Sequence, residues 1–535
     1  MRTAAFVLAL SSAAAAQVTG TFRYQDRVYD AGGFTGAQPF RPVRQAEVEI
    51  VRSSDGATMG TGTTDGAGAF SVAGVPGSTD VFARVYARRA GSGMNASVRN
   101  NPFAAAVYTA ASSPFVTTVA GNGTSGTVDL TIAGGAAPAF NIFDAAVKSF
   151  QYQATVDVDL PALPPLLLLY WEAGTANGTY FDPVAGAVFF LGLASDPDQY
   201  DDDILLHEIG HWVANAFSKD DTPGGSHTVV SQLDARLSWS EGWAHYWSAA
   251  VRRAFPGEYA APAIQVDNFG SGNSFFDLEG PSFPVEAVMA TNELAVGAAL
   301  WDITDAANEG TFDLLSGNEM AVWQAVNDRI PLRTEITLED FRAGLELEAP
   351  LIMADVTGSE GTLRILNALG VRYYLDGNEP NGGPGTAAPL GPGGAAQRTI
   401  FGAGDEDWYA LTLTGEGSVQ AWTSALGDGG NTTLELFASD GFTLLAANDD
   451  RAPGDPSSFV QASLSGTGTF FLRVRASTGV IEHGYYDLSA AVGPPLSGTA
   501  PRAGYCGASL PAPSGTVPAA AGALLLGMLA WRRRR

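Results

Sequence analysis

The stretch YDDDILLHEIGHWVANAF, from Tyr200 to Phe217, decides the fold of the central part of this chain. Its two histidines, His207 and His211, are four residues apart, so a helix places both imidazoles on one face, one turn apart. Both rings can then reach one zinc ion, and Glu208, about 100° further around the helix, lies beside that ion. The aspartates before the motif favour a helix start. This is the HExxH signature, which predicts a zinc site with Glu208 as the general base.

HExxH alone is only moderately specific, because chance matches occur, so a third ligand is needed. The segment LSWSEGWAHYWSAAVRRAF, residues 237–255, supplies Glu241 thirty positions after His211. Its tryptophans recur every fourth residue and predict a helix face in the core, while Glu241 and His245 lie on the nearly opposite face. An unpaired buried carboxylate is costly. We therefore expect Glu241 to face the first helix and to bind the metal.

HEIGH followed by SEGWAHYW resembles the two zinc motifs of the gluzincin metallopeptidases, and of fungalysin in particular. The resemblance covers residues 140–369 and implies an α+β zincin core. By this resemblance the zinc ligands are His207, His211 and Glu241, and Glu208 is the general base. The implied activity is that of a zinc metalloendopeptidase.

Two positions depart from the family pattern. The family has an aspartate four residues after the third ligand, which steadies a ligand histidine, and His245 replaces it here. His245 either takes over that role, which is the interpretation that we favour, or joins the metal. The late histidine of thermolysin-like enzymes, which stabilises the tetrahedral intermediate, is absent, because no histidine lies between His245 and His483. Four residues are alternative replacements: Asn292, Glu293, Tyr246 and His227. Of these, His227 is expected to be solvated in its loop.

The chain before and after this core has the pattern of β-sheet proteins. Short alternating strands and glycine turns predict a β-sandwich over residues 17–135, in which TTDGAGAFSVAGVP resembles carboxypeptidase regulatory-like modules. A linker at 375–395 separates the core from strands at 396–495, which resemble the bacterial pre-peptidase C-terminal domain, a non-catalytic β-sandwich. There Asp449 and Asp450 either hold calcium or, as we favour, form a solvated turn.

The core itself, residues 136–374, combines an amphipathic helix, buried strands and then mainly helices from residue 201 onward. One of its strands, AVFFLGL, is either an edge strand to which a peptide substrate adds, or a covered strand. The predicted fold class is therefore multidomain, with an α+β zincin metallopeptidase core flanked by two all-β sandwich domains.

Both ends of the chain have the composition of sorting signals. Residues 1–16 contain Arg2, an apolar stretch and a small-residue cleavage site, typical of a secretory signal peptide. Residues 496–535 contain Cys506, a spacer, fifteen apolar residues and a final run of arginines. This tail resembles MYXO-CTERM sorting signals, which implies transient membrane insertion and then a cell-surface (outer-membrane) or extracellular location. A plain C-terminal membrane anchor is the alternative.

The composition excludes some partners. The formal net charge is −27 and only Lys148 and Lys219 are lysines, so the surface repels phosphate backbones and nucleic-acid binding is not expected. With one cysteine, the domains depend on packing and metal rather than on disulfides. We expect a monomer whose partner is a peptide or protein substrate. The rival hypotheses are an inert zinc-binding surface protein and an adhesion protein.

Overall fold

The computed structural model describes two compact units. The first comprises the chain up to Ala216 together with Trp247–Phe276, and the second comprises Phe217–Tyr246 and the chain from Asp277 onward. Helix α3 (Ala235–Arg253) contributes to both. The predicted sorting tail with Cys506, and the predicted signal peptide except for its last residue, lie outside the described residues. Those residues are 16–231, 233–269, 272–280, 291–306, 315–333, 336–352, 362, 365–366, 369, 381–391, 395–401, 406–424, 426, 431–477 and 483–494.

The N-terminal part of the first unit is all-β, as the alternating pattern predicts. One sheet joins β1 (Gln17–Gln25) to β13 (Gly123–Leu130), β4 (Phe40–Pro42) and β7 (Ala69–Ala73). Alternate residues of β1 are buried, as expected for a strand with one face on a core. A second sheet has the order β11-β8-β5-β6, with β12 beside β8; these strands are Thr109–Ala111, Asp80–Tyr86, Glu47–Arg52, Thr58–Thr63 and Phe115–Val116.

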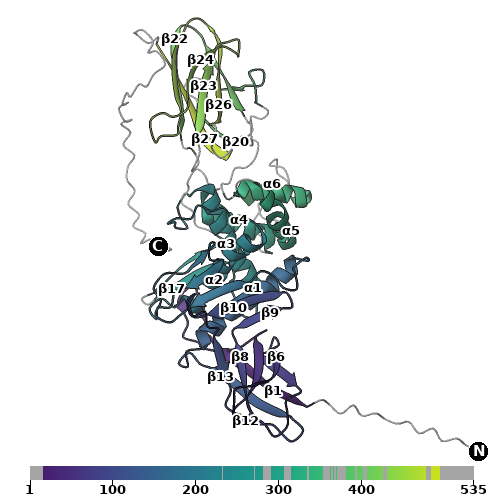
Figure 1. The fold of residues 1–535 in the computed structure, drawn as a ribbon. Helices are drawn as coiled ribbons and strands as arrows, with labels where there is room; N and C mark the ends of the chain where they lie inside the picture. The colour runs from purple at the N-terminus through teal and green to yellow at the C-terminus, as the bar shows by residue number, and fades with distance from the viewer. Residues whose placement is uncertain are drawn as a thin grey trace, which may run out of the picture. The chain divides into compact units, whose positions relative to one another are not determined.

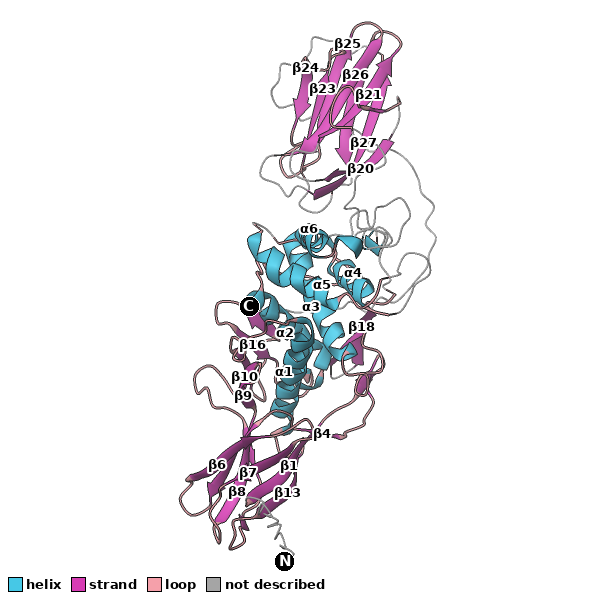
Figure 2. Ribbon diagram, turned by 90° about the vertical axis from the view of Figure 1, so that its right-hand side faces the viewer, coloured by secondary structure: helices cyan, strands magenta, loops and turns pink. Residues whose placement is uncertain are grey.

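A central sheet crosses the boundary that we predicted at residue 135. Its order is β15-β16-β14-β10-β9, and β10 (Met94–Arg99) pairs in parallel with β14 (Leu167–Trp171). Strands β9 (Arg88–Gly91) and β10 thus come from the predicted sandwich but belong to the sheet beside helix α1 (Ala137–Val156), as Figures 1 and 2 show. Alternation identifies a strand but not its partner.

The same sheet decides between our two interpretations of AVFFLGL. Strand β16 (Ala187–Phe190) lies between β14 and β15 (Tyr180–Asp182), so it is a covered strand and the edge-strand interpretation is wrong. The short strand β15 forms this edge of the sheet. Its hairpin with β16 turns at the predicted DPVAG segment.

Helices follow the central sheet, but not without interruption. Helix α2 (Asp202–Phe217) and helix α3 contain the two predicted zinc motifs. Between α3 and α4 (Glu293–Thr304) the chain forms a two-stranded sheet that we did not predict, β17 (Ile264–Phe269) with β18 (Gly272–Asp277). Further helices are α5 (Glu319–Gln324) and α6 (Leu338–Glu348), the second of which begins with a capping box of Thr337 and Asp340.

The tryptophans of α3 are in the core, as their spacing predicts. In the second unit Trp239 stacks on Phe341 with ring centroids 5.1 Å apart, and Trp243 lies 6.5 Å from Trp323. In the first unit Trp247 donates a hydrogen bond from Nε1 to Ser149 Oγ at 3.0 Å. Apolar packing of this kind fixes the rotation of α3 about its axis, and therefore the direction in which Glu241 points.

A β-sandwich lies in the C-terminal part of the second unit, which confirms the predicted all-β C-terminal region and the multidomain fold. Its two sheets have the orders β19-β21-β26-β23-β24 and β20-β27-β22-β25, drawn in Figure 2. These strands are Ala388–Pro389, Glu406–Leu413, Gly468–Ala476, Thr432–Phe437, Leu444–Asn448, Ala395–Phe401, His483–Gly493, Gly417–Ser424 and Phe459–Leu464. Within the described part of the chain, no helix is long and apolar enough to span a membrane.

A buried cluster of charges lies in the first unit. Lys148 of α1, with 2 % of its surface exposed, lies 3.1 Å from Asp144, 3.4 Å from Asp202 and 3.1 Å from Glu258. Burial opposes the positive charge, but the neighbouring Tyr259 and the carboxylates raise the pKa of Lys148 well above its ordinary value. This one lysine is therefore the counter-ion for several buried acids.

The N-terminal strands reach the same cluster. Tyr24 donates a hydrogen bond from its hydroxyl to Asp144 at 2.9 Å, and Arg44 lies 3.4 Å from Asp144 and also contacts Glu258. Tyr29 donates to Asp203 of α2 at 2.5 Å. The N-terminal region is thus joined to helices α1 and α2 by buried polar contacts, beyond what an independent accessory module would require.

Candidate metal centre

The aspartates before HEIGH hold the start of α2 in place. Asp203 accepts hydrogen bonds from the backbone N–H of Val266 at 2.5 Å and from Tyr29, and it pairs with Arg252 at 2.7 Å. Asp201 accepts from Asn268, through both the backbone and the side chain. We predicted these aspartates at the start of the helix, and all three are buried there. Burial raises the pKa of Asp203 to about 6, against the opposing effects of Arg252 and Tyr29.

His207 and His211 lie on one face of α2, as predicted. Their Nε2 atoms are 3.2 Å apart and their ring planes are nearly perpendicular, at 84°. Two ligands of one tetrahedral zinc ion, each at about 2.0–2.1 Å, are roughly 3.3–3.4 Å apart. The pair therefore fits two positions of such an ion, and both rings are at least 98 % buried.

Glu208 is held by the edge of the central sheet. Its Oε2 accepts a hydrogen bond from the backbone N–H of Phe181, in strand β15, at 2.7 Å. Only 1 % of Glu208 is exposed. The Glu208 carboxylate is therefore held in place by the backbone of the neighbouring strand.

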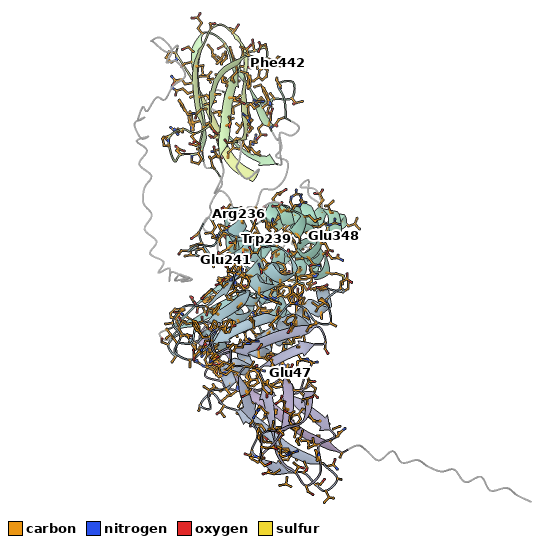
Figure 3. The ribbon with its side chains drawn as sticks, viewed as in Figure 1. Glu47, Arg236, Trp239, Glu241, Glu348 and Phe442 are labelled. Atoms are coloured by element: carbon orange, nitrogen blue, oxygen red, sulfur yellow. The ribbon has the colours of Figure 1, made fainter. Side chains whose placement is uncertain are left out.

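Glu241 of α3 belongs to one group of metal-type side chains with His207 and His211. One ligand atom from each of His207, His211 and Glu241 lies within 4.8 Å of the others, and all three residues are buried. Figure 3 labels Glu241 close to Trp239 on the ribbon. In the described residues no fourth histidine, cysteine, aspartate or glutamate joins this group. A zinc ion held by only three protein ligands keeps a position for water or substrate, as catalytic zinc sites do.

His227 is buried, which corrects our expectation of a solvated loop histidine. Its Nε2 lies 3.5 Å from Glu241 Oε2 and 3.7 Å from Glu293 Oε2, and only 6 % of the residue is exposed. The loop reaches this position through Gly224 and Gly225, which have φ values of +63° and +133° that other residues rarely adopt. The two glycines of TPGGSH were the sequence signal for this backbone conformation.

The start of α4 completes this part of the centre. Asn292 caps the helix, because its Oδ1 accepts from the backbone N–H of Ala295 while its Nδ2 donates to the carbonyl of Val229. Both ends of the amide thus bind backbone, which argues against the role of Asn292 in stabilising an intermediate. Glu293 follows in the first helical turn, fully buried, 3.9 Å from His245 Nε2.

Another group of metal-type side chains, apart from the histidine pair and Glu241, consists of acids alone. Asp196, Asp198 and Asp267 each offer an oxygen within 4.8 Å of the others. Burial and the neighbouring charge of Asp196 raise the pKa of Asp267 to about 7. Neither Asp449 nor Asp450, our calcium candidates, belongs to any such group in the described residues.

We expect Asp267→Asn to stabilise the protein at pH 8 and to have no effect at pH 4. Because the pKa of Asp267 is about 7 in the fold and ordinarily 3.8, the folded state holds a proton that the unfolded chain loses. This contribution to stability is present below about pH 4 and is lost as the pH rises through 7. The variant should gain about 1–3 kcal/mol in the free energy of unfolding at pH 8. Urea unfolding at both pH values measures this, and an equal gain at both would contradict the assignment.

Comparison with known proteins relates the middle of the chain to peptidases. Residues 165–331 match the model of the mycolysin C-terminal domain family, and this range includes both predicted zinc motifs, His227 and Glu293. The match covers less than half of the chain and indicates a relationship to secreted peptidases. None of the curated proteins compared with the chain is significantly similar to it.

Several solved structures resemble parts of the chain at low overall scores. The pre-peptidase C-terminal domain of a Bacillus anthracis collagenase is 17 % identical over 19 % of this chain and 93 % of its own, with a TM-score of 0.17. A 9R-lipoxygenase from Cyanothece is 12 % identical over 29 % of this chain and 26 % of its own, with a TM-score of 0.14. PliG, a periplasmic inhibitor of g-type lysozyme from Aeromonas hydrophila, is 16 % identical over 20 % of this chain and 99 % of its own, with a TM-score of 0.13.

Proposed function

We propose that this protein is an exported zinc metalloendopeptidase of the gluzincin type. The observation that carries the proposal is the grouping of His207, His211 and Glu241, with one ligand atom of each within 4.8 Å of the others. Glu208 lies beside this group with a fixed carboxylate. The match to the mycolysin C-terminal domain over the same residues supports a peptidase. In this proposal His207, His211 and Glu241 hold the ion and the C-terminal sandwich takes no part in the chemistry.

A zinc ion held by these residues would act as a Lewis acid, which polarises the peptide carbonyl and lowers the pKa of bound water. The protein supplies the proton transfers. Glu208 accepts the proton of the attacking water and later delivers it to the amine that leaves. The hydrogen bond from the Phe181 backbone keeps one carboxylate oxygen occupied, so the Glu208 side chain cannot rotate freely while the proton moves.

The substrate, the location and the role of His245 belong to the same proposal. Its substrate is a peptide or protein, and its products are released at the cell surface or outside the cell. His245 Nε2 lies 3.9 Å from Glu293, and we assign His245 to the support of the centre and not to the metal.

The proposal is tested by reversible removal of the metal from the purified full chain. We expect 1,10-phenanthroline to lower the cleavage of casein at least tenfold, because a chelator removes an ion held by only three protein ligands. Zinc added after dialysis should restore the cleavage, and the variant with both His207→Ala and His211→Ala should not respond. Casein cleavage that resists the chelator and persists in the double variant would exclude a zinc peptidase centred on HEIGH.

A further inference from the structure

A second group of metal-type side chains lies within the second unit and shares one residue with the first. His227, Glu241 and Glu293 each offer a ligand atom within 4.8 Å of the others, and all three are buried. They come from three elements: the loop after α2, helix α3 and the first turn of α4. We propose that these side chains bind a second divalent cation and that Glu241 is shared between two ions. Only the first of those ions rests on the proposed function.

The hydrogen bond on the far side of His227 fixes which nitrogen faces the acids. Nδ1 lies 3.2 Å from the carbonyl oxygen of Gly225. A carbonyl oxygen can only accept, so Nδ1 carries the proton and Nε2 presents a lone pair in the neutral ring. Ligand histidines characteristically donate their other N–H to a carbonyl or carboxylate in this way.

The distances on the near side suit an ion better than a hydrogen bond. Nε2 of His227 is 3.5 Å from Glu241 and 3.7 Å from Glu293, whereas N–H···O hydrogen bonds are about 2.7–3.2 Å long. Two ligands of one tetrahedral zinc ion are about 3.3–3.5 Å apart, given metal–ligand distances of about 2.0–2.2 Å. The two distances from His227 are therefore close to those between the ligands of a bound zinc ion.

The charges of the group also favour a cation. Glu241 and Glu293 are buried, with exposed fractions of 1 % and 0 %, and their oxygens lie within 4.8 Å. Two carboxylates this close inside a protein repel each other, and each pays for the loss of water. A divalent ion between them and His227 offsets both costs. One imidazole and two carboxylates form a ligand set suited to zinc and related divalent metals.

The packing of α3 against α4 brings the two glutamates together. A Cβ on Gly242 would lie 2.5 Å from Val296 and 2.9 Å from the carbonyl oxygen of Glu293, so only glycine fits this contact. Gly297 is packed on the other side, with its added Cβ 3.2 Å from the carbonyl oxygen of Gly242. This close approach sets Glu241, next to Gly242, and Glu293, one helical turn before Val296 and Gly297, at a fixed separation.

A second ion at this place would supply fixed positive charge near the reacting carbonyl, as in two-metal peptidases. The sequence has no late histidine for that purpose, and His227 then contributes through a metal. The alternative is that His227, Glu241 and Glu293 lie together without any second ion.

The two alternatives differ in the number of zinc ions per chain. The full chain is stripped of metal and dialysed against buffered free zinc with excess calcium. The calcium occupies sites made only of oxygen ligands. The zinc bound per chain is then measured by mass spectrometry. We expect two zinc ions in the wild type and two in the control His483→Ala, which alters the one histidine outside residues 207–245. His227→Ala and Glu293→Gln should each bind one, with the second ion weakened about 100-fold or more.

The variant with both His207→Ala and His211→Ala separates the two proposals. It should keep one ion, bound by the second group. A wild type with one ion that this variant loses would overturn the second site and leave the proposed function standing. A wild type with one ion that persists in this variant but is lost in His227→Ala would support the second site and overturn the metal group of the proposed function. Equal zinc in the wild type, His227→Ala and Glu293→Gln overturns the second site, and circular dichroism of each variant shows that the comparison is between folded proteins.

Discussion

Replacement of Glu208 with glutamine is expected to lower the rate constant for peptide hydrolysis by about 10²–10⁴-fold while the bound zinc is unchanged, because general-base catalysis contributes about that factor. The side chain keeps its place in this variant. The amide oxygen of glutamine can still accept the N–H of Phe181, which Glu208 Oε2 now accepts at 2.7 Å. The amide lacks the basicity to take a proton from water. The rate of hydrolysis therefore falls while the position of the side chain is unchanged.

The measurement is the initial rate of casein cleavage together with the zinc content of each preparation. Glu416→Gln is a matched control, because Glu416 is exposed between strands β21 and β22 of the C-terminal sandwich. It should retain wild-type activity. If Glu208→Gln with its zinc intact cleaves casein within about threefold of the wild type, the general base lies elsewhere and the proposed mechanism fails.

The part of the site that the sequence predicts is the part that depends on helix geometry. The spacing of His207 and His211 fixes a shared face, and the tryptophan pattern of α3 fixes the direction of Glu241, because one helical turn relates residues three or four apart. These are local relations. They do not depend on how the rest of the chain folds, which is why the ligand group could be predicted from the sequence alone.

The remainder of the site depends on long-range contacts, for which the sequence has no periodic signal. His227 is buried because two glycines turn its loop and because Asn292, more than sixty residues later, holds that loop by the carbonyl of Val229. The Phe181 N–H meets Glu208 only because β15 covers β16. Strand pairing is likewise non-local, so residues 94–99 were placed within the predicted sandwich, although β10 pairs with β14 in the central sheet.

The identities of the flanking regions remain predictions. The carboxypeptidase regulatory-like and pre-peptidase C-terminal resemblances rest on sequence motifs, and the sorting tail lies outside the described residues. The N-terminal strands nevertheless have a structural consequence of their own. Through Tyr24, Tyr29 and Arg44 they contact the helices that hold the HEIGH motif, so removal of this region would expose acids that are now paired.

Replacement of Lys148 with methionine is expected to lower the free energy of unfolding by about 3–5 kcal/mol, the cost of removing one partner from a buried ion pair. Methionine retains most of the volume of the side chain, so packing changes little. The charge is lost, and Asp144, Asp202 and Glu258, at 3.1–3.4 Å from Nζ, then face one another with Arg44 as the remaining cation. At present Lys148 and hydrogen bonds from Tyr259 outweigh burial and lower the pKa of Asp202.

Urea unfolding at pH 7, followed by tryptophan fluorescence, measures this effect. Lys219→Met is the matched control, because the other lysine of the chain is only half-buried and donates to the carbonyl of Arg333, so its loss should cost less than about 1 kcal/mol. Addition of Glu258→Gln to Lys148→Met should recover part of the stability by removing one unpaired carboxylate. Equal effects of the two lysine variants, with no recovery in the double variant, would mean that the cluster is screened by water. The attachment of α2 to the N-terminal strands would then depend on apolar packing, and the aspartates before HEIGH would serve only to start the helix.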